Sequence, residues 1–426
     1  MTPIYNEYIN FLKAKTNKQL NNEAAKLGFE LKENYYWLDK SIIKYFNSKF
    51  EVCKLCRLYI GDDLSLTYKF YKELDNDIIS WSDLVKHNEE HLLKIERRSL
   101  DLIKTAISEK HNAEPIILSS TGKDSQCITY LVRQVVPNAL IVCNNTSLDC
   151  AESYIMMNEL DNKLILSPKE GFYQWRERNN FVPTRFARAC CGIFKEGVFA
   201  DYWNKDKPTI IFLGMRNAES NTRSGYGDYW NNPKWSDKWQ GVLPIRKWTE
   251  MDVWLYTFLR NIPINRKYKY GYSRVGCAIA CPYYTKSTWI LDEYFYPKLY
   301  KRWHDILDND FVKNNKDIIL NCTQEEYHLA WNGGKHREIA NEQVISEFAA
   351  RNDLDINVAK KYFDQKCHQC GKPIKGKDTY GMNLKMFGRH INKFLCRSCL
   401  MKDLGLNKKE WNEKVEDFKS QNCKLF

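Results

Sequence analysis

The feature that most constrains the fold is a short polar segment between two apolar ones. Residues 115–119 form an apolar run that predicts a buried strand, and residues 124–135 have the periodicity of a helix. The polar segment STGKDS, residues 120–125, follows the strand and includes the first two residues of the helix. A turn is expected within it. A helix that starts directly after such a turn presents unpaired N–H groups and the positive end of its dipole to an anion. The segment therefore predicts a phosphate-binding unit, and the alternative is an ordinary strand–turn–helix corner.

Strands and helices alternate on either side of this unit. Further strands are expected at residues 139–143 and 209–214, and a helix at 90–108 leads into the first strand. The alternation predicts an α/β domain with a mainly parallel sheet flanked by helices. We expect four regions, namely a helical N-terminal region (1–111, with a helix at 6–14), the α/β domain (112–290), a helical extension (291–364) and a cysteine-bearing module (365–426).

The charge balance favours anionic partners. The net charge is +12, which suits nucleotides or nucleic acid, although a Lys-rich soluble surface is an equally good reading. No apolar run reaches the length of about 18 residues that a membrane span requires, and the N-terminus has no signal-peptide pattern. We expect a cytoplasmic protein with no membrane partner.

Six ordered segments resemble motifs of one superfamily. Residues 120–125 resemble the S-G-G-K-D-S loop of ATP pyrophosphatases, with Thr121 in place of the first glycine. The other segments resemble N-T-G-L-E-x-x-E-T, R-x-C-C-x-x-x-K, G-x-R-x-x-E-S-x-x-R, P-[LI]-x-x-W-[TS]-x-x-D-V-W and I-P-x-N…G-Y…G-C, at residues 145–153, 188–195, 214–223, 244–254 and 262–277. Together they resemble the phosphoadenosine phosphosulfate reductase-like superfamily, and this resemblance implies an adenine-nucleotide α-hydrolase-like fold.

The resemblance also implies which residues bind and activate ATP. Lys123, Asp124, Arg216 and Arg223 are expected to act in catalysis, with Mg²⁺ as a further cofactor. The expected nucleotide-binding residues are Ser120, Thr121, Gly122, Lys123, Asp124, Ser125, Arg188, Lys195, Gly214, Arg216, Glu219 and Arg223. Gly122 lets the backbone approach an anion closely, and the two arginines can contact phosphate or sulfate through two nitrogens each. Glu219 can orient an arginine, or form a plain surface ion pair.

Fifteen cysteines are many for a reducing compartment, where clustered cysteines indicate metal or redox chemistry. Cys190, Cys191, Cys277 and Cys281 resemble the four-cysteine pattern of adenylylsulfate reductases, which implies a 4Fe-4S cluster. One residue more separates the second pair here than in that pattern, so structural zinc or free thiols stay open. Cys53 and Cys56 have no visible second pair, and incidental cysteines explain them.

A second cysteine set lies near the C-terminus. Cys367, Cys370, Cys396 and Cys399 form two C-x-x-C pairs, separated by a Lys- and Arg-rich stretch. Four thiolates at this spacing predict a structural, tetrahedral Zn²⁺ site. The module can hold nucleic acid or a protein partner, or it can simply stabilise the end of the chain.

Within this superfamily, retention of the lysine-bearing loop is typical of members that split ATP. The resemblance therefore implies ATP-dependent adenylation and sulfur transfer, as in DNA phosphorothioation sulfurtransferases, with nucleic acid as acceptor and a sulfur donor such as a cysteine desulfurase. One alternative is a reductase of adenylylsulfate or its phosphorylated form, which needs a thiol reductant. Another is a non-catalytic adaptor that senses nucleotides or binds nucleic acid.

Overall fold

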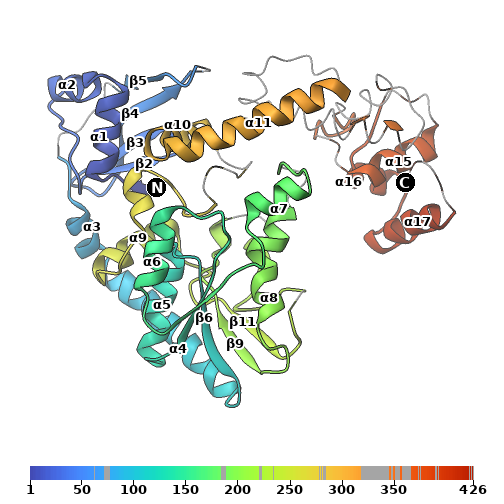
Figure 1. Cartoon of the computed structure of the whole chain (residues 1–426), viewed down its shortest axis with the longest axis horizontal. Coiled ribbons are helices and arrows are strands. Elements are labelled where there is room, and N and C mark those ends of the chain that lie inside the picture. Colours follow the sequence, from blue (N-terminus) through green and yellow to red (C-terminus); the bar gives the residue numbers. More distant parts are fainter. Residues whose placement is uncertain are drawn as a thin grey trace. The chain divides into compact units, whose positions relative to one another are not determined.

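The computed structural model of the chain divides into two compact units, Met1–Ile319 and Leu320–Phe426. Figure 1 shows their elements in order along the sequence. The structure describes residues 1–61, 63–71, 77–183, 189–219, 223–233, 235–277, 279, 281, 285–317, 345–346, 349–350, 356, 366–372, 374, 376–388, 391, 393–421, 423 and 425.

The N-terminal region contains an antiparallel sheet, so the prediction of a mostly helical region is wrong for residues 36–70. The sheet has the order β1-β2-β3-β4-β5, formed by Thr2–Pro3, Tyr36–Asp39, Ile42–Phe46, Val52–Ile60 and Leu66–Phe70. These strands are rich in aromatic and β-branched residues, which pack well on a pleated surface. The expected helix at residues 6–14 is confirmed as α1 (Asn6–Lys15), which is followed by α2 (Gln19–Lys26).

Two helices connect this sheet to the next domain. Helix α3 (Trp81–His87) begins with a capping box, in which the Ser80 and Asp83 side chains each accept a hydrogen bond from the other residue's backbone N–H. Helix α4 (Glu89–Glu109) confirms the amphipathic helix expected at residues 90–108.

The central domain is built on a six-stranded sheet, which confirms the α/β prediction. The strand order is β10-β11-β9-β6-β7-β8, and every neighbouring pair is parallel except β10 with β11. The strands are Tyr229–Trp230, Trp239–Val242, Thr209–Phe212, Glu114–Ser119, Leu140–Asn144 and Lys163–Leu166 in that order. The three strands expected from the sequence are β6, β7 and β9.

Helices cover both faces of this sheet, because alternate residues of each strand enter different cores. Ile117, Ile141 and Phe212 pack with residues of α4, α5 (Lys123–Val135) and α9 (Glu250–Leu259). Ile116, Val142 and Ile211 pack with residues of α8 (Val198–Tyr202). The remaining elements of this domain are α6 (Ala151–Glu159), α7 (Phe172–Arg178), the π-helix η1 (Cys191–Gly197) and the 3-10 turns η2 (Asn217–Glu219), η3 (Arg223–Gly225) and η4 (Arg266–Tyr270).

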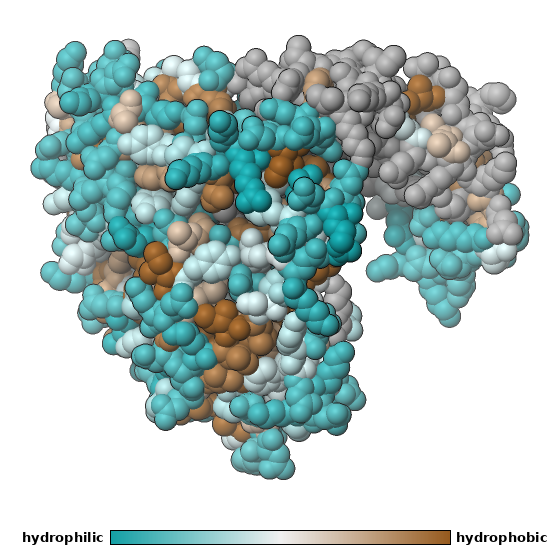
Figure 2. Space-filling model, viewed as in Figure 1, coloured by the Kyte–Doolittle hydropathy of each residue, from teal (hydrophilic) through white to brown (hydrophobic). Residues whose placement is uncertain are grey.

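The first unit ends in two helices, α10 (Lys286–Phe295) and α11 (Pro297–Asp317). They agree with the expected helical extension up to residue 317, and most of the rest of that extension lies outside the described residues. No helix in the described part of the chain is both long and apolar enough to cross a membrane. The face in Figure 2 is mainly hydrophilic, with hydrophobic residues gathered in its lower middle.

The described part of the second unit is small and consists mainly of helices. Its helices are α15 (Lys377–Phe387), α16 (Arg397–Asp403) and α17 (Lys408–Ser420). One core surrounds Tyr380 and Phe394, and another joins Leu400 to Trp411 and Val415.

Candidate active site

The nucleotide loop joins the end of β6 to the start of α5. Its unusual residue is Thr121, whose φ of 57° is rare for a β-branched side chain. The Thr121 N–H donates to Ser119 Oγ at 3.2 Å, and its Oγ1 accepts from Asn265 Nδ2 at 3.2 Å. Thr121 and Asn265 are both buried, so these bonds hold the turn without competition from water.

Gly122 has an extended backbone, with φ −77° and ψ 159°, so its role is spatial rather than conformational. A Cβ at Gly122 would lie 3.3 Å from Ser120 Oγ and 3.4 Å from the Tyr268 hydroxyl. The absence of a side chain at Gly122 thus leaves space beside the Ser120 and Tyr268 hydroxyls. The two serine hydroxyls lie 3.4 Å apart there, and Ser125 Oγ donates to the Gly122 carbonyl at 2.9 Å.

Two buried cations share one carboxylate at the first turn of α5. Lys123 Nζ lies 3.1 Å from Asp124 Oδ2, and Arg216 Nε lies 2.5 Å from Asp124 Oδ1. Lys123 and Arg216 are 4 % and 3 % exposed. The loop therefore has two desolvated positive groups beside the N–H groups at a helix start, an arrangement suited to phosphate.

Glu250 is a second carboxylate at Lys123, with Oε1 3.5 Å from Nζ. Burial lowers the pKa of Lys123, but the opposing effects of Tyr268, Asp124 and Glu250 together are larger, so the net shift is upward and the ammonium stays charged. Glu250 was not expected at this site. The only sequence signal for it was its position inside the motif at residues 244–254, where Thr249 and Asp252 form the capping box of α9.

Gly214 explains how Arg216 reaches the loop. A Cβ at Gly214 would lie 2.8 Å from the Asp124 carbonyl carbon and 2.9 Å from the Ser125 nitrogen. Only glycine therefore lets the segment after β9 pack against the first turn of α5. Beyond it, Glu219 Oε2 accepts from the Arg216 backbone N–H at 3.1 Å and pairs with Arg223 Nη1.

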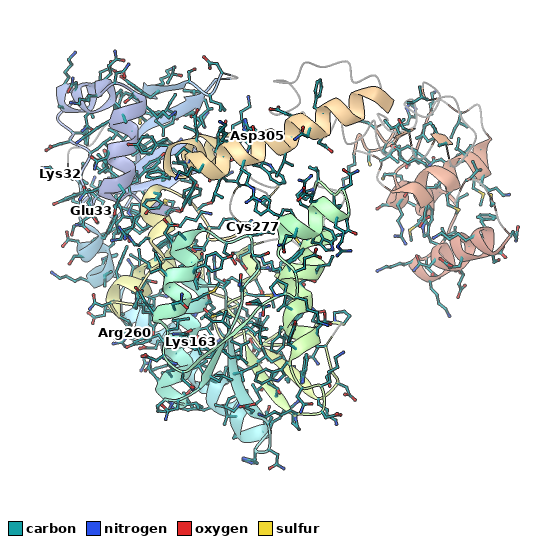
Figure 3. All side chains as sticks on the ribbon, viewed as in Figure 1. Lys32, Glu33, Lys163, Arg260, Cys277 and Asp305 are labelled. Atoms are coloured by element: carbon teal, nitrogen blue, oxygen red, sulfur yellow. The ribbon has the colours of Figure 1, made fainter. Side chains whose placement is uncertain are left out.

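Four cysteines converge on a second location in the first unit. A hydrogen bond with Cys191, burial, and the nearby Cys277 and Cys281 all raise the pKa of Cys190. Burial and Cys281 raise the pKa of Cys277 to about 12, and Lys195 opposes them. Because the four thiols affect one another's pKa, they lie close together in the first unit. Figure 3 places Cys277 beyond the carboxyl ends of the parallel strands.

The local backbone at this location is also distinctive. Cys191 begins the π-helix η1, and a Cβ at Gly197 would lie 2.6 Å from the Gly192 oxygen. Any side chain at position 197 would therefore clash with the preceding turn of this helix. The Lys195 carbonyl of η1 accepts from Asn144 Nδ2 at 2.9 Å, which ties η1 to the end of β7. Arg188, expected beside these cysteines, lies outside the described residues.

The four thiols suit an iron–sulfur cluster in ligand type and number. They are nevertheless less closely grouped than a second set. Among the described residues, the group of potential metal ligands that lie within 4.8 Å of one another consists of Cys367, Cys370, Cys396 and Cys399.

The C-terminal set has the arrangement expected for a metal. Cys370 Sγ and Cys396 Sγ are 3.6 Å apart, and the Cys367 N–H donates to the Lys372 carbonyl at 2.8 Å, which folds the first pair into a tight turn. Burial raises the pKa of Cys367, but hydrogen bonds from backbone N–H groups outweigh it and lower the value to about 6. A thiolate is the form that binds metal.

The remaining cysteine pair, on β4, has a different setting. Cys56 is fully buried in the N-terminal core, and Cys53 packs partly buried against the same core. Burial raises the pKa of Cys56 to about 12, which keeps its thiol protonated at neutral pH and so disfavours metal binding. These cysteines pack as small apolar residues.

The central domain matches a known protein family. Residues 114–282 match the family model described as "Phosphoadenosine phosphosulfate reductase domain". An uncharacterized protein of Methanocaldococcus jannaschii is 26 % identical over 231 residues, which cover 53 % of this chain and 56 % of that protein. The chain thus spans little more than half the length of that relative.

Other relatives carry names that state an activity, and two of them differ in that activity. An adenosine 5'-phosphosulfate reductase of Shouchella clausii is 26 % identical over 42 % of this chain and 76 % of the reductase. A sulfate adenylyltransferase subunit 2 of Aliarcobacter butzleri is 26 % identical over 41 % of this chain and 65 % of the subunit. The similarity therefore reaches both a sulfonucleotide reductase and an adenylyltransferase subunit.

Proposed function

We propose that this chain binds a nucleotide and splits ATP between the α- and β-phosphates. The match of residues 114–282 to the phosphoadenosine phosphosulfate reductase domain supports nucleotide binding. The chain adenylates an acceptor and then transfers sulfur to it, with nucleic acid as the acceptor. The observation that carries the proposal is the pair of buried cations, Lys123 and Arg216, that share the half-buried Asp124 at the start of α5.

The charges of this group suit a triphosphate. The N–H groups at the start of α5 and the Lys123 ammonium meet the phosphate oxygens, while Arg216 adds a planar cation. Both side chains are buried, so their attraction for phosphate is stronger than it would be in bulk water. Mg²⁺, when bound, would neutralise phosphate charge through its contacts with phosphate oxygens.

During adenylation, negative charge develops on the leaving pyrophosphate, close to the two buried cations. An acceptor oxygen forms a bond to the α-phosphorus, and the bond from that phosphorus to the bridging oxygen breaks. Pyrophosphate leaves with the electron pair, and any proton on the acceptor oxygen passes to solvent. Lys123 and Arg216 stabilise the charge that grows on the leaving group, because they are already fixed in place by Asp124.

Sulfur transfer needs a donor and a reductant. A persulfide, of the kind that a cysteine desulfurase makes, attacks the activated acceptor through its terminal sulfur, and AMP leaves with the electrons of the broken bond. A thiol reductant then cleaves the remaining S–S bond with two electrons. Cys190, Cys191, Cys277 and Cys281 would hold an iron–sulfur cluster, which supplies electron-transfer and sulfur-binding chemistry when present.

A reductase of adenylylsulfate or phosphoadenylylsulfate is the second candidate. The cysteine group in the central domain and the similarity to the Shouchella reductase favour it.

The net charge of +12 favours a polyanionic acceptor for the sulfur. We propose that the C-terminal module binds zinc through its four cysteines and contributes to binding this acceptor.

Product analysis separates the candidates. Anaerobically purified protein is incubated with ATP, single-stranded nucleic acid and a persulfide donor, or with adenylylsulfate and a dithiol. Pyrophosphate and AMP from the first mixture support the proposal, and sulfite from the second supports the reductase. An adaptor yields neither product.

The cysteine proposal has its own test. Anaerobic protein should carry about four iron atoms and matching sulfide per chain. Cys277→Ser should lose most of this iron, whereas Cys53→Ser, on the separate strand β4, should retain it. Iron-free protein with full activity would remove the cluster from the account.

A further inference from the structure

We propose that Tyr268 contacts phosphate in the nucleotide site, through a hydrogen bond that its hydroxyl donates to a phosphate oxygen. This inference rests on the proposed position of the nucleotide at residues 120–125. Tyr268 lies in η4, far along the chain from that loop, and no motif residue pointed to it.

The hydroxyl of Tyr268 lies at the start of α5. It accepts a hydrogen bond from the Lys123 backbone N–H at 3.1 Å, and it is 3.4 Å from the point that a Cβ on Gly122 would occupy. The centre of its ring is 5.6 Å from Lys123 Nζ. The hydroxyl therefore covers one of the N–H groups that normally face an anion at a helix start.

The same hydroxyl retains a proton that it can donate. Burial raises the pKa of Tyr268, and Lys123 opposes the shift without reversing it, so the phenol is neutral at neutral pH. Its oxygen accepts a hydrogen bond from the Lys123 N–H. Within the part of the chain that the structure describes, no group accepts its proton. A phosphate oxygen at the loop would supply an acceptor.

The turn that carries Tyr268 is fixed before any ligand arrives. Asn265 Oδ1 accepts from the Lys267 N–H at 3.0 Å and caps η4, while its Nδ2 reaches Thr121 and Ser153. The Tyr268 ring packs edge-on against Trp254, with centroids 5.1 Å apart. The hydroxyl is thus preorganised, so little entropy is lost when it binds phosphate.

The test compares Tyr268→Phe with Tyr256→Phe by calorimetric titration with ATP and with inorganic pyrophosphate. Phenylalanine keeps the ring contacts with Trp254 and removes only the hydroxyl. Loss of a hydrogen bond to a charged group should weaken both ligands about tenfold or more. Tyr256→Phe is the matched control, because that buried hydroxyl donates to Glu96 Oε1 at 2.6 Å, and its affinities should match wild type.

The outcomes distinguish this inference from the proposed function. If Lys123→Ala abolishes binding but Tyr268→Phe binds both ligands as tightly as wild type, Tyr268 is only a helix cap and the inference fails alone. If wild type binds neither ligand, both fail. Should Tyr268→Phe not fold, a fluorinated tyrosine placed at 268 preserves ring and hydroxyl. Its fluorine resonance should shift on saturation with pyrophosphate, and an unchanged resonance overturns the inference.

Discussion

Arg216 Nε lies 2.5 Å from Asp124 Oδ1, although the two residues are 92 positions apart in the chain. The other oxygen of Asp124 meets Lys123. One carboxylate therefore positions two cations that come from different elements. Because a buried charge without a partner is costly, removing either partner should destabilise the fold around the loop.

The planar guanidinium at this position should matter more than its charge alone. Arg216→Lys is expected to weaken ATP binding about tenfold, because an ammonium cannot keep the Nε contact with Asp124 while facing phosphate. Arg223→Lys is the comparison, since Arg223 is partly exposed and its ion pair with Glu219 is worth little. Titration calorimetry gives both affinities. Equal losses in the two variants would contradict the distinction between a buried and a peripheral arginine.

Thr121 and Asn265 should show coupled effects on ATP binding. Asn265→Ala removes the hydrogen bond that holds Thr121 at positive φ, whereas Thr121→Gly removes both the bond and the conformational strain. The loss caused by Asn265→Ala should therefore be about 1 kcal/mol smaller in a Thr121→Gly background. A double-mutant cycle of binding free energies measures this coupling. Strictly additive losses would show that Asn265 acts elsewhere.

Asp292 should make stability depend on pH. Burial raises its pKa from 3.8 to about 7, against the effects of Lys267 and Tyr272. Between these values the folded state holds a proton that the unfolded state has released, so this group destabilises the fold as pH rises. The expected slope is at most about 1.4 kcal/mol per pH unit.

Asp292→Asn removes this titration. The variant should gain stability relative to wild type between pH 4 and pH 7, and the gain should level off above the folded pKa. Urea unfolding of both proteins across that range measures the difference. A difference that is constant with pH would mean that Asp292 does not titrate as its burial implies.

The C-terminal cysteines should bind about one zinc ion per chain. Cys396→Ser should abolish this zinc and expose the second unit to limited proteolysis, because its core packs around the same cysteines. Cys423→Ser, outside the four-residue group, should keep the metal. Zinc analysis of the three proteins decides the matter, and equal zinc contents would refute the site.

The local sequence pattern was enough to predict the fold of the central domain and part of its nucleotide site. Apolar runs around residues 115–119, 139–143 and 209–214 marked strands, and the turn at 120–125 marked the helix start, because such signals depend on near neighbours. The N-terminal sheet was missed because its strands lie between clear amphipathic helices, which led to a helical reading of the whole region. Leu66–Phe70 alternates apolar and polar residues and so carried a strand signal, but its pairing with Val52–Ile60 is not visible in either segment alone.

The contacts of Glu250, Asn265 and Tyr268 had no local signature. Each reaches the loop only because α9 and η4 fold back onto α5. The segments containing Glu250 and Asn265 were recognised from motif resemblance, but the partners of these side chains depend on tertiary packing. Thr121 is the opposite case, since its departure from the usual glycine was visible in the sequence and its hydrogen bond with Asn265 supplies the compensation.

ATP–pyrophosphate exchange measures cleavage of ATP at the α-phosphate directly. Wild type with Mg²⁺, acceptor nucleic acid and labelled pyrophosphate should form labelled ATP, because adenylation is reversible before AMP leaves. Lys123→Ala should reduce the exchange at least about a hundredfold while its circular dichroism stays that of wild type, and the exposed Lys205→Ala should exchange normally. Undiminished exchange in Lys123→Ala would contradict the assignment of the loop to ATP cleavage.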